Sequence, residues 1–249
     1  ITYRPDSSTI PDPFGRAVRD HHRGNRTEPL LARDGDETDE HPIERYYFDP
    51  FDGTGHGEWL ESWLDGPLLD LGAGAGRHTL YFQERFETVA VEVSDALVET
   101  MRERRVEDAR RGDMFDVRSQ FERDRFQSAL AIGTQICLAG SMDGLQRFLA
   151  DLAHVTTPDA TAVVHSYDPT VEGVEELLGY RVDPTLGLAH RVMGFEYEGE
   201  RDEILYFRLF SPERLREATV ATPWTIADVV RPNWSGSYRA ALRKVGRGP

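Results

Sequence analysis

An apolar stretch that runs into three alternating glycines most strongly limits what this 249-residue chain can fold into. Residues 68–71 have the length and apolarity of a buried strand, and a helix-like segment begins near residue 77. Between them stand Gly72, Gly74 and Gly76. Glycines let the backbone turn sharply and let a ligand approach without meeting a β-carbon, and the helix start offers free N–H groups. We therefore predict a ligand site at this junction, as in doubly wound sheets.

The same strand-then-helix order recurs along the middle of the chain. Valines at positions 89, 91 and 93 predict a strand, and Ser94 is suited to cap the helix that follows it. This alternation predicts a parallel sheet with helices on both faces. The remaining predicted elements are strands over residues 126–132 and 161–167, a helix over 142–155, a turn at 158–159 and a charged edge strand within 106–114.

The alternation stops near residue 170. Two strands, over residues 195–197 and 204–210, are expected around a charged turn, before a helix that begins at Ser211. The last two predicted strands, 225–230 and 237–243, are joined by a short link that favours an antiparallel hairpin. The predicted fold class is α/β: a Rossmann-like, doubly wound, mostly parallel seven-stranded sheet with a C-terminal antiparallel hairpin and a β-hairpin inserted before the last helix.

Residues 1–42 differ in composition from the rest of the chain. They are polar, contain three prolines before residue 14 and show no apolar period of either kind. We predict a loosely packed polar N-terminal arm over residues 1–42 and a single domain over residues 43–249, with an insertion at about 170–210. His21 and His22 are interpreted as solvated surface residues, and no metal is expected, because no second cluster of ligands accompanies them.

Two acidic residues near the glycines indicate what kind of ligand binds. Glu92 stands twenty positions after Gly72, at the end of the next strand, where a carboxylate accepts hydrogen bonds from a ribose. A dinucleotide fingerprint would need a glycine at position 77, which is Arg77 here. Asp70 would repel a pyrophosphate but would attract a cationic group. The sequence therefore predicts a nucleoside that carries positive charge and no phosphate.

Three segments resemble the class I S-adenosylmethionine-dependent methyltransferases: Asp-Leu-Gly-Ala-Gly-Ala-Gly-Arg-His at 70–78, Val-Glu-Val-Ser-Asp at 91–95 and Gly-Asp-Met at 112–114. The resemblance runs from about residue 46 to the C-terminus and implies S-adenosyl-L-methionine as the cofactor. It implies that Asp70 and the three glycines surround the methionine part and that Glu92 binds the ribose hydroxyls. The other contacts that it implies are Val93 beside the adenine, Asp113 at the adenine amino group, Met114 over the ring, and Gly133 near the sulfonium, with Thr134 and Gln135 close by.

Methyl transfer from a sulfonium is an in-line displacement that needs alignment and a dry pocket more than one particular catalytic residue. His165 is a candidate general base, since the pKa of histidine lies near neutrality, and Tyr167 lies two positions further on. Tyr46, ahead of the core, resembles the aromatic lid of related enzymes. Packing roles stay open as alternatives for His165 and Tyr46.

Motifs that the sequence lacks narrow the methyl acceptor. After the predicted fourth strand, residues 133–137 contain no Asn/Asp-Pro-Pro-aromatic motif, unlike the enzymes that methylate amino groups of DNA bases and glutamine. Cys137 follows isoleucine rather than proline, so we interpret it as a small buried residue and not as the nucleophile of a cytosine C5 enzyme. The insertion is expected to roof the acceptor pocket, and its aromatic and cationic residues favour a small, anionic metabolite: Tyr180, Arg181, His190, Arg191 and Tyr197.

The chain has 44 acidic and 29 basic residues, a formal net charge of −15. This balance disfavours a large phosphate-binding surface, so no DNA partner is expected. An RNA acceptor stays an alternative, because local basic patches survive a negative average. The densest patch lies within residues 102–111, where interleaved acidic residues favour a charge-paired helix instead.

Lysine is nearly absent, since Lys244 is the only one and the other 28 basic residues are arginines. Many carboxylates with almost no lysine suit a halophilic protein with an acidic surface; a genome rich in arginine codons is the alternative. The single cysteine excludes an internal disulfide, no segment is apolar enough to span a membrane, and the first residues do not resemble a secretory signal. We expect a soluble, cytoplasmic protein.

The predicted function is therefore S-adenosylmethionine-dependent methyl transfer to an unidentified, small-molecule acceptor. Two alternatives stay open: a non-catalytic S-adenosylmethionine-binding module and an RNA methyltransferase. An NAD(P)-dependent oxidoreductase is less favoured, because the glycine spacing differs from the dinucleotide fingerprint. The oligomeric state is left open.

Overall fold

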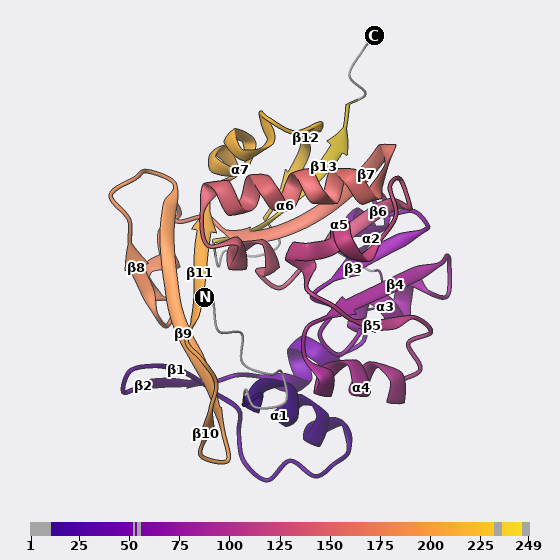
Figure 1. Ribbon diagram of the computed structural model, residues 1–249. Helices are drawn as coiled ribbons and strands as arrows, with labels where there is room; N and C mark the ends of the chain where they lie inside the picture. The colour runs from indigo at the N-terminus through magenta and orange to yellow at the C-terminus, as the bar shows by residue number, and fades with distance from the viewer. Residues whose placement is uncertain (1–10, 52, 54–55, 232–235, 246–249) are drawn as a thin grey trace, which may run out of the picture.

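The main sheet of the computed structural model, which describes residues 11–51, 53, 56–231 and 236–245, has seven strands (Figure 1). Their order is β12-β13-β7-β6-β3-β4-β5. Neighbours from β7 to β5 pair in parallel, whereas β13 pairs antiparallel with both β7 and β12. The strand bounds are β3 (Leu68–Leu71), β4 (Thr88–Glu92), β5 (Ala109–Arg111), β6 (Phe126–Ala131), β7 (Thr156–Tyr167), β12 (Trp224–Val230) and β13 (Ser237–Lys244).

Helices cover both faces of this sheet. On one face α5, α6 and α7 pack against strand residues such as Val89 and Ala129, and Leu149 of α6 is fully buried there. On the other face α2, α3 and α4 contact the alternate residues, such as Ala90 and Leu130. No helix within the described residues is both long and apolar enough to cross a bilayer. The helix bounds are α2 (His56–Glu61), α3 (Arg77–Phe82), α4 (Asp95–Glu103), α5 (Val117–Gln120), α6 (Met142–Val155) and α7 (Pro212–Thr219).

The predicted mostly parallel sheet with a C-terminal antiparallel hairpin is confirmed. The charged strand β5 lies at the edge, and Ser94 caps α4 by accepting a hydrogen bond from the Leu97 N–H at 3.1 Å. The turn predicted at residues 158–159 is wrong, because both residues lie inside β7. The β6–β7 ladder shifts register between Phe126 and Ser128. This irregularity accommodates Pro158 of β7, which has no N–H to donate to the ladder.

A second sheet of six antiparallel strands lies beside the first (Figure 1). Its long central strand, β9, pairs with β1, β8, β10 and β11. The hairpin predicted in the insertion is thus part of a larger sheet, which also takes up two N-terminal strands. The strand bounds are β1 (Leu31–Asp34), β2 (Glu37–Glu40), β8 (Tyr180–Val182), β9 (Leu188–Tyr197), β10 (Glu200–Arg201) and β11 (Leu205–Phe210).

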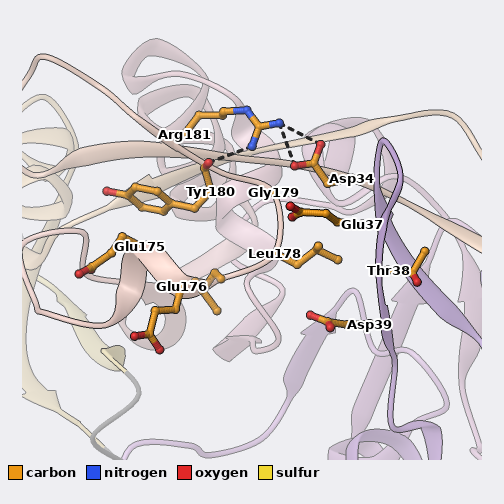
Figure 2. A pocket seen from close by; sticks show the side chains of 11 residues that line it. Asp34, Glu37, Thr38, Asp39, Glu175, Glu176, Leu178, Gly179, Tyr180 and Arg181 are labelled. Atoms are coloured by element: carbon orange, nitrogen blue, oxygen red, sulfur yellow. Dashed lines mark hydrogen bonds and ion pairs between the residues drawn. The ribbon is translucent and has the colours of Figure 1, made fainter.

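A hollow of about 500 Å³ lies between the β1–β2 hairpin and residues 175–181 (Figure 2). Three carboxylates from the hairpin segment and two from residues 175 and 176 line it. Its single basic side chain, Arg181, is paired with Asp34 at 2.8 Å. The hollow is therefore strongly acidic, and none of the residues that line it is a predicted cofactor residue.

Residues 11–42 are folded, which corrects the expectation of a loosely packed arm. Helix α1 (Pro13–His22) begins at Asp12, whose carboxylate accepts a hydrogen bond from the Gly15 N–H at 2.8 Å. Ala17 and Val18 are fully buried against a core shared with β9 and α4. The apolar face of this helix is so short that the polar composition of the segment hides it. Residues 1–10 of the predicted arm lie outside the described residues.

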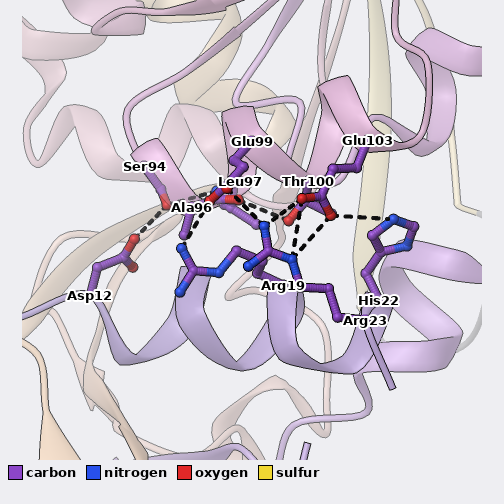
Figure 3. Close-up of polar contacts among 10 residues, drawn as sticks. All are labelled: Asp12, Arg19, His22, Arg23, Ser94, Ala96, Leu97, Glu99, Thr100 and Glu103. Atoms are coloured by element: carbon purple, nitrogen blue, oxygen red, sulfur yellow. Dashed lines mark hydrogen bonds and ion pairs between the residues drawn. The ribbon is translucent and has the colours of Figure 1, made fainter. Parts of the chain in front are cut away.

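A polar network joins α1 to α4 (Figure 3). Arg19 and Arg23 of α1 pair with Glu99 of α4 at 3.0 and 2.7 Å. At the start of both helices, the Ser94 hydroxyl donates a hydrogen bond to the Asp12 carboxylate. Because Ser94 also caps α4, one small cluster fixes the first turns of both helices relative to each other.

Substitution of Leu30 tests whether the N-terminal residues share the core of the main domain. It is fully buried in the cluster that α1 forms with β9, so Leu30→Ala should lower the free energy of unfolding by about 2–5 kcal/mol. Urea denaturation measures this change. Ile204→Ala, at a side chain that is 63% exposed, is the control and should change it by about 0.5 kcal/mol or less. Equal, small effects of both substitutions would show that residues 11–42 are an independent arm.

Candidate functional site

The loop between β3 and α3 has a left-handed backbone conformation at three positions, which glycine adopts readily. Gly72, Gly74 and Gly76 have φ values of +64°, +59° and +77°. A β-carbon on Gly72 would lie 2.3 Å from the Gln135 side chain, and one on Gly74 would lie 3.2 Å from the Tyr47 ring. The three predicted glycines thus form a tight cradle at the carboxyl end of β3, and two side chains already rest against it. A ligand held there contacts these side chains or displaces them.

Glu92 is buried at the end of β4, and its carboxylate points to the glycine loop. Its Oε2 accepts a hydrogen bond from the Gly74 N–H at 3.0 Å, and its Oε1 accepts from the N–H groups of Val93 and Ser94 at 2.8 and 3.3 Å. Burial raises the pKa of Glu92, although these hydrogen bonds act in the opposite direction. A carboxylate has about four acceptor positions, so one position on Oε2 is left for a ligand.

Asp70, at the end of β3, is a second buried carboxylate. Its Oδ2 accepts a hydrogen bond from the Thr79 hydroxyl at 2.6 Å. Burial raises the pKa of Asp70 to about 6, and the nearby charge of Glu92 adds to this effect. In the described part of the chain, no Arg, Lys or His nitrogen lies within 4 Å of either carboxylate. The pair therefore forms a buried acidic site that a cationic ligand would neutralise.

The other predicted cofactor residues lie in the segments that follow β4, β5 and β6. Val93 is 64% exposed, just beyond the end of β4. Asp113 is exposed, and its carboxylate accepts a hydrogen bond from the Phe115 N–H at 2.8 Å. Met114 is buried in the core, and Gly133 is exposed with a φ of +86°. Their contacts with an adenine or a sulfonium stay predictions.

His165 on β7 has a structural role in this geometry. Its Nδ1 accepts a hydrogen bond from the Thr134 N–H at 2.8 Å, in the turn that follows β6. Thr134 has a φ of +65°, which is uncommon for a residue with a side chain, so this bond holds a strained turn. Burial, together with the charge of Arg239, lowers the pKa of His165 to about 3. The ring is then neutral with its proton on Nε2, which favours a core role over that of a general base.

Tyr46 and Tyr47 lie in a single π-helical turn, Glu44–Phe48, close to the glycine loop. The Tyr47 ring packs over Gly74, and its hydroxyl lies 3.0 Å from His41 Nε2. Tyr46 is 49% exposed, and its ring centre lies 5.3 Å from that of His41. His41 is a functional candidate that the sequence does not reveal, because a lone histidine in a polar segment carries no spacing signal.

Among the residues predicted to roof the acceptor pocket, Arg191 on β9 is near this site. Its charge acts on the hydroxyls of Tyr167, at the end of β7, and of Tyr46. Tyr167 itself is largely buried, and burial raises its pKa. The other predicted roof residues are engaged elsewhere: Arg181 with Asp34, His190 with Asp183, Tyr197 against α1 and Tyr180 at the acidic hollow.

Two further residues considered for chemistry are held in packing contacts. Cys137 is buried as predicted, its Sγ lies 3.3 Å from the Ser166 hydroxyl oxygen, and burial raises its pKa to about 12. His21 lies 2.6 Å from a Glu44 oxygen and packs against the Phe48 ring. Within the described residues, no three His, Cys, Asp or Glu side chains are grouped as metal ligands would be.

Comparison with known proteins agrees with this geometry. Residues 68–159, from β3 into β7, match the family model described as a methyltransferase domain. Over this segment the chain is similar to methyltransferase domains. Its glycine loop, Glu92 and Asp113 all lie inside the matched segment, and the match agrees with the predicted resemblance to class I methyltransferases. No curated protein sequence matches the chain.

Solved structures show the same fold. A methyltransferase from Bacteroides fragilis, in complex with S-adenosyl-L-homocysteine, has a TM-score of 0.75 at 21% identity, with 94% of each chain covered. A 1,6-didemethyltoxoflavin-N1-methyltransferase from Burkholderia thailandensis has a TM-score of 0.53 at 17% identity, covering 97% of this chain and 98% of that one. An amino pentose methyltransferase from Micromonospora echinaspora has a TM-score of 0.52 at 17% identity, covering 72% and 83%.

The raised pKa of Asp70 predicts a pH dependence of stability. The folded protein keeps a proton on this carboxyl up to about pH 6, whereas an unfolded aspartate loses it near pH 4. The folded state therefore binds more protons in this window, so this carboxyl lowers the free energy of unfolding as the pH rises from 4 to 6. Asp70→Asn should remove that contribution, as measured by denaturant unfolding at several pH values. Glu84→Gln, at an exposed site, is the control, and unaltered pH dependence in Asp70→Asn would contradict the assignment.

Proposed function

We propose that this methyltransferase domain binds S-adenosylmethionine at the glycine loop and transfers its methyl group to a small molecule. The observation that carries the proposal is the pair of buried carboxylates, Asp70 and Glu92, which are 3% and 7% exposed. Neither has a cationic partner within 4 Å among the described residues. Burying such charges without compensation is costly, so a positively charged ligand is expected between them and solvent.

The residues of the cradle fit a cationic nucleoside. The free acceptor position on Glu92 Oε2 suits a ribose hydroxyl, and Val93 lies exposed beside it. Asp70 lies at the other side of the loop, where its charge favours a cation. When bound, S-adenosylmethionine would supply a methyl group on a sulfonium, from which the neutral thioether is a good leaving group. The tight turns at Gly72 and Gly133 give close backbone approach, so alignment is the chief contribution of the chain.

A small acceptor is favoured over RNA. The densest arginine patch is engaged within the protein: Arg110 pairs with Asp108 at 2.7 Å, and Arg111 pairs with Asp95 at 2.9 Å. Arg104 donates to the carbonyl of Ala75 rather than facing solvent freely. The similar enzymes from Burkholderia and Micromonospora are named for small acceptors, 1,6-didemethyltoxoflavin and an amino pentose. These features support a soluble metabolite as the acceptor.

The amino-acid composition, with many carboxylates and a single lysine, leads us to place the protein in the cytoplasm of a salt-adapted cell. Its single lysine, Lys244, is buried and donates hydrogen bonds to the carbonyls of Ala153 and Thr156, both at 2.8 Å. Lysine therefore serves a structural site here, while arginine and carboxylates supply the surface charge. Short, strongly hydrated carboxylates keep such a surface soluble when salt screens the repulsion between molecules.

Glu92→Ala tests the cofactor site. Loss of charge-assisted hydrogen bonds should weaken binding of S-adenosylhomocysteine by about 1–3 kcal/mol, measured by isothermal titration calorimetry. Glu84→Ala, at an exposed position in the same domain, should leave the dissociation constant unchanged. An unchanged constant in Glu92→Ala would remove this residue from the site. Binding of NAD(P) without binding of S-adenosylhomocysteine would refute the proposed function itself.

A further inference from the structure

Arg191 differs from the other arginines of the second sheet in having no acidic partner. In the described part of the chain, no carboxylate oxygen lies within 4 Å of its nitrogens. The four other arginines on these strands are each paired at 2.8 Å: Arg33 with Glu196, Arg181 with Asp34, Arg201 with Glu196 and Arg208 with Asp183. In a chain with 44 acidic residues, an unpaired arginine on this sheet is an exception that needs a reason.

The guanidinium of Arg191 is held in place, and the nearby carboxylate charge, that of Asp39, acts on it from beyond 4 Å. Its Nε donates a hydrogen bond to the Leu178 carbonyl at 2.7 Å, which fixes the plane of the group. The side chain is largely buried, and burial lowers its pKa. Its two terminal nitrogens have no hydrogen-bond acceptor among the described residues. A fixed, planar, partly buried guanidinium with free terminal donors matches the two-pronged geometry of a carboxylate or phosphate.

The position of Arg191 relates it to the methyl-transfer site. Its charge acts on Tyr167 at the carboxyl end of β7, on Tyr46 of the π-helical turn, and on His41. His41 in turn contacts Tyr47, whose ring covers Gly74 of the cofactor cradle. Arg191 on β9 is thus connected to the cradle through His41 and Tyr47.

We propose that Arg191 binds an anionic oxygen group, a carboxylate or phosphate, of the methyl acceptor, with Tyr46 and Tyr167 beside the body of that molecule. The inference rests on the proposed function and specifies its substrate class. The acceptor would approach the sulfonium with its anion on Arg191, while Asp70 and Glu92 face the cationic cofactor. The acidic hollow at Arg181 does not suit this ligand, because its lining would repel an anion.

The experiment uses a metabolite extract separated on an anion-exchange resin into retained and unretained pools. Each pool is incubated with the full chain and S-adenosylmethionine carrying a labelled methyl group. Label should enter the retained pool, and phosphatase treatment of that pool distinguishes a phosphate from a carboxylate. Arg191→Gln should lower the transfer at limiting acceptor by about tenfold or more, and Arg191→Lys should restore part of it. Arg201→Gln, the same change at an exposed position of the sheet, should have no effect.

Calorimetry with S-adenosylhomocysteine separates the possible failures. The Arg191→Gln protein should bind it with an unchanged dissociation constant and keep its melting temperature. A weaker constant would instead assign Arg191 to the carboxylate of the cofactor and overturn the proposal. Label in the unretained pool, label unaffected by Arg191→Gln, or tight binding of S-adenosylhomocysteine with no labelled pool would also overturn it. If the unaltered protein did not bind S-adenosylhomocysteine, the cofactor site itself would be refuted instead.

Discussion

The Glu92 carboxylate joins the elements on which the candidate site depends. Its two oxygens accept hydrogen bonds from Gly74 in the β3–α3 loop and from Val93 and Ser94 in the β4–α4 turn. Two neighbouring loops are therefore fixed through one buried side chain. The Ser94 hydroxyl extends the connection to Asp12 at the start of α1. A change at Glu92 is therefore expected to disturb the shape of the cradle as well as any ligand contact.

Charge compensation separates the surface of this protein from its site. On the surface, arginines and carboxylates pair, as Arg23 and Glu99 do between α1 and α4. Asp70 and Glu92 are buried and Arg191 is partly buried, and among the described residues none of the three has a group of opposite charge within 4 Å. Uncompensated buried charges destabilise a fold, so their retention is more readily explained by ligands of complementary charge than by stability. In our proposal the two negative charges face the cofactor and the positive charge of Arg191 faces the acceptor.

The sequence predicted the elements of the main sheet well, because they carry strong local signals. Residues 68–71 and 142–155 were placed without error, since a short, mostly apolar run that ends in glycines and a long amphipathic period are both strong local signals. The N-terminal segment was predicted wrongly. Ala17 and Val18 bury a face too short to dominate its polar composition, and β1 depends on pairing with β9, more than 150 residues away. Such non-local pairing leaves no period in the sequence.

The candidate site shows the same division between local and non-local signals. Glycine spacing and a strand-end carboxylate identified the cradle, but nothing in the sequence ranked Arg191 above the other insertion residues, because only the folded sheet leaves it unpaired. His165 illustrates the reverse case. Its Nδ1 accepts a hydrogen bond from the Thr134 N–H, and burial lowers its pKa to about 3, which favours a packing role over that of a general base. We therefore infer that the attacking atom of the acceptor needs no proton removed by His165, and that alignment in the site is the chief contribution of the chain.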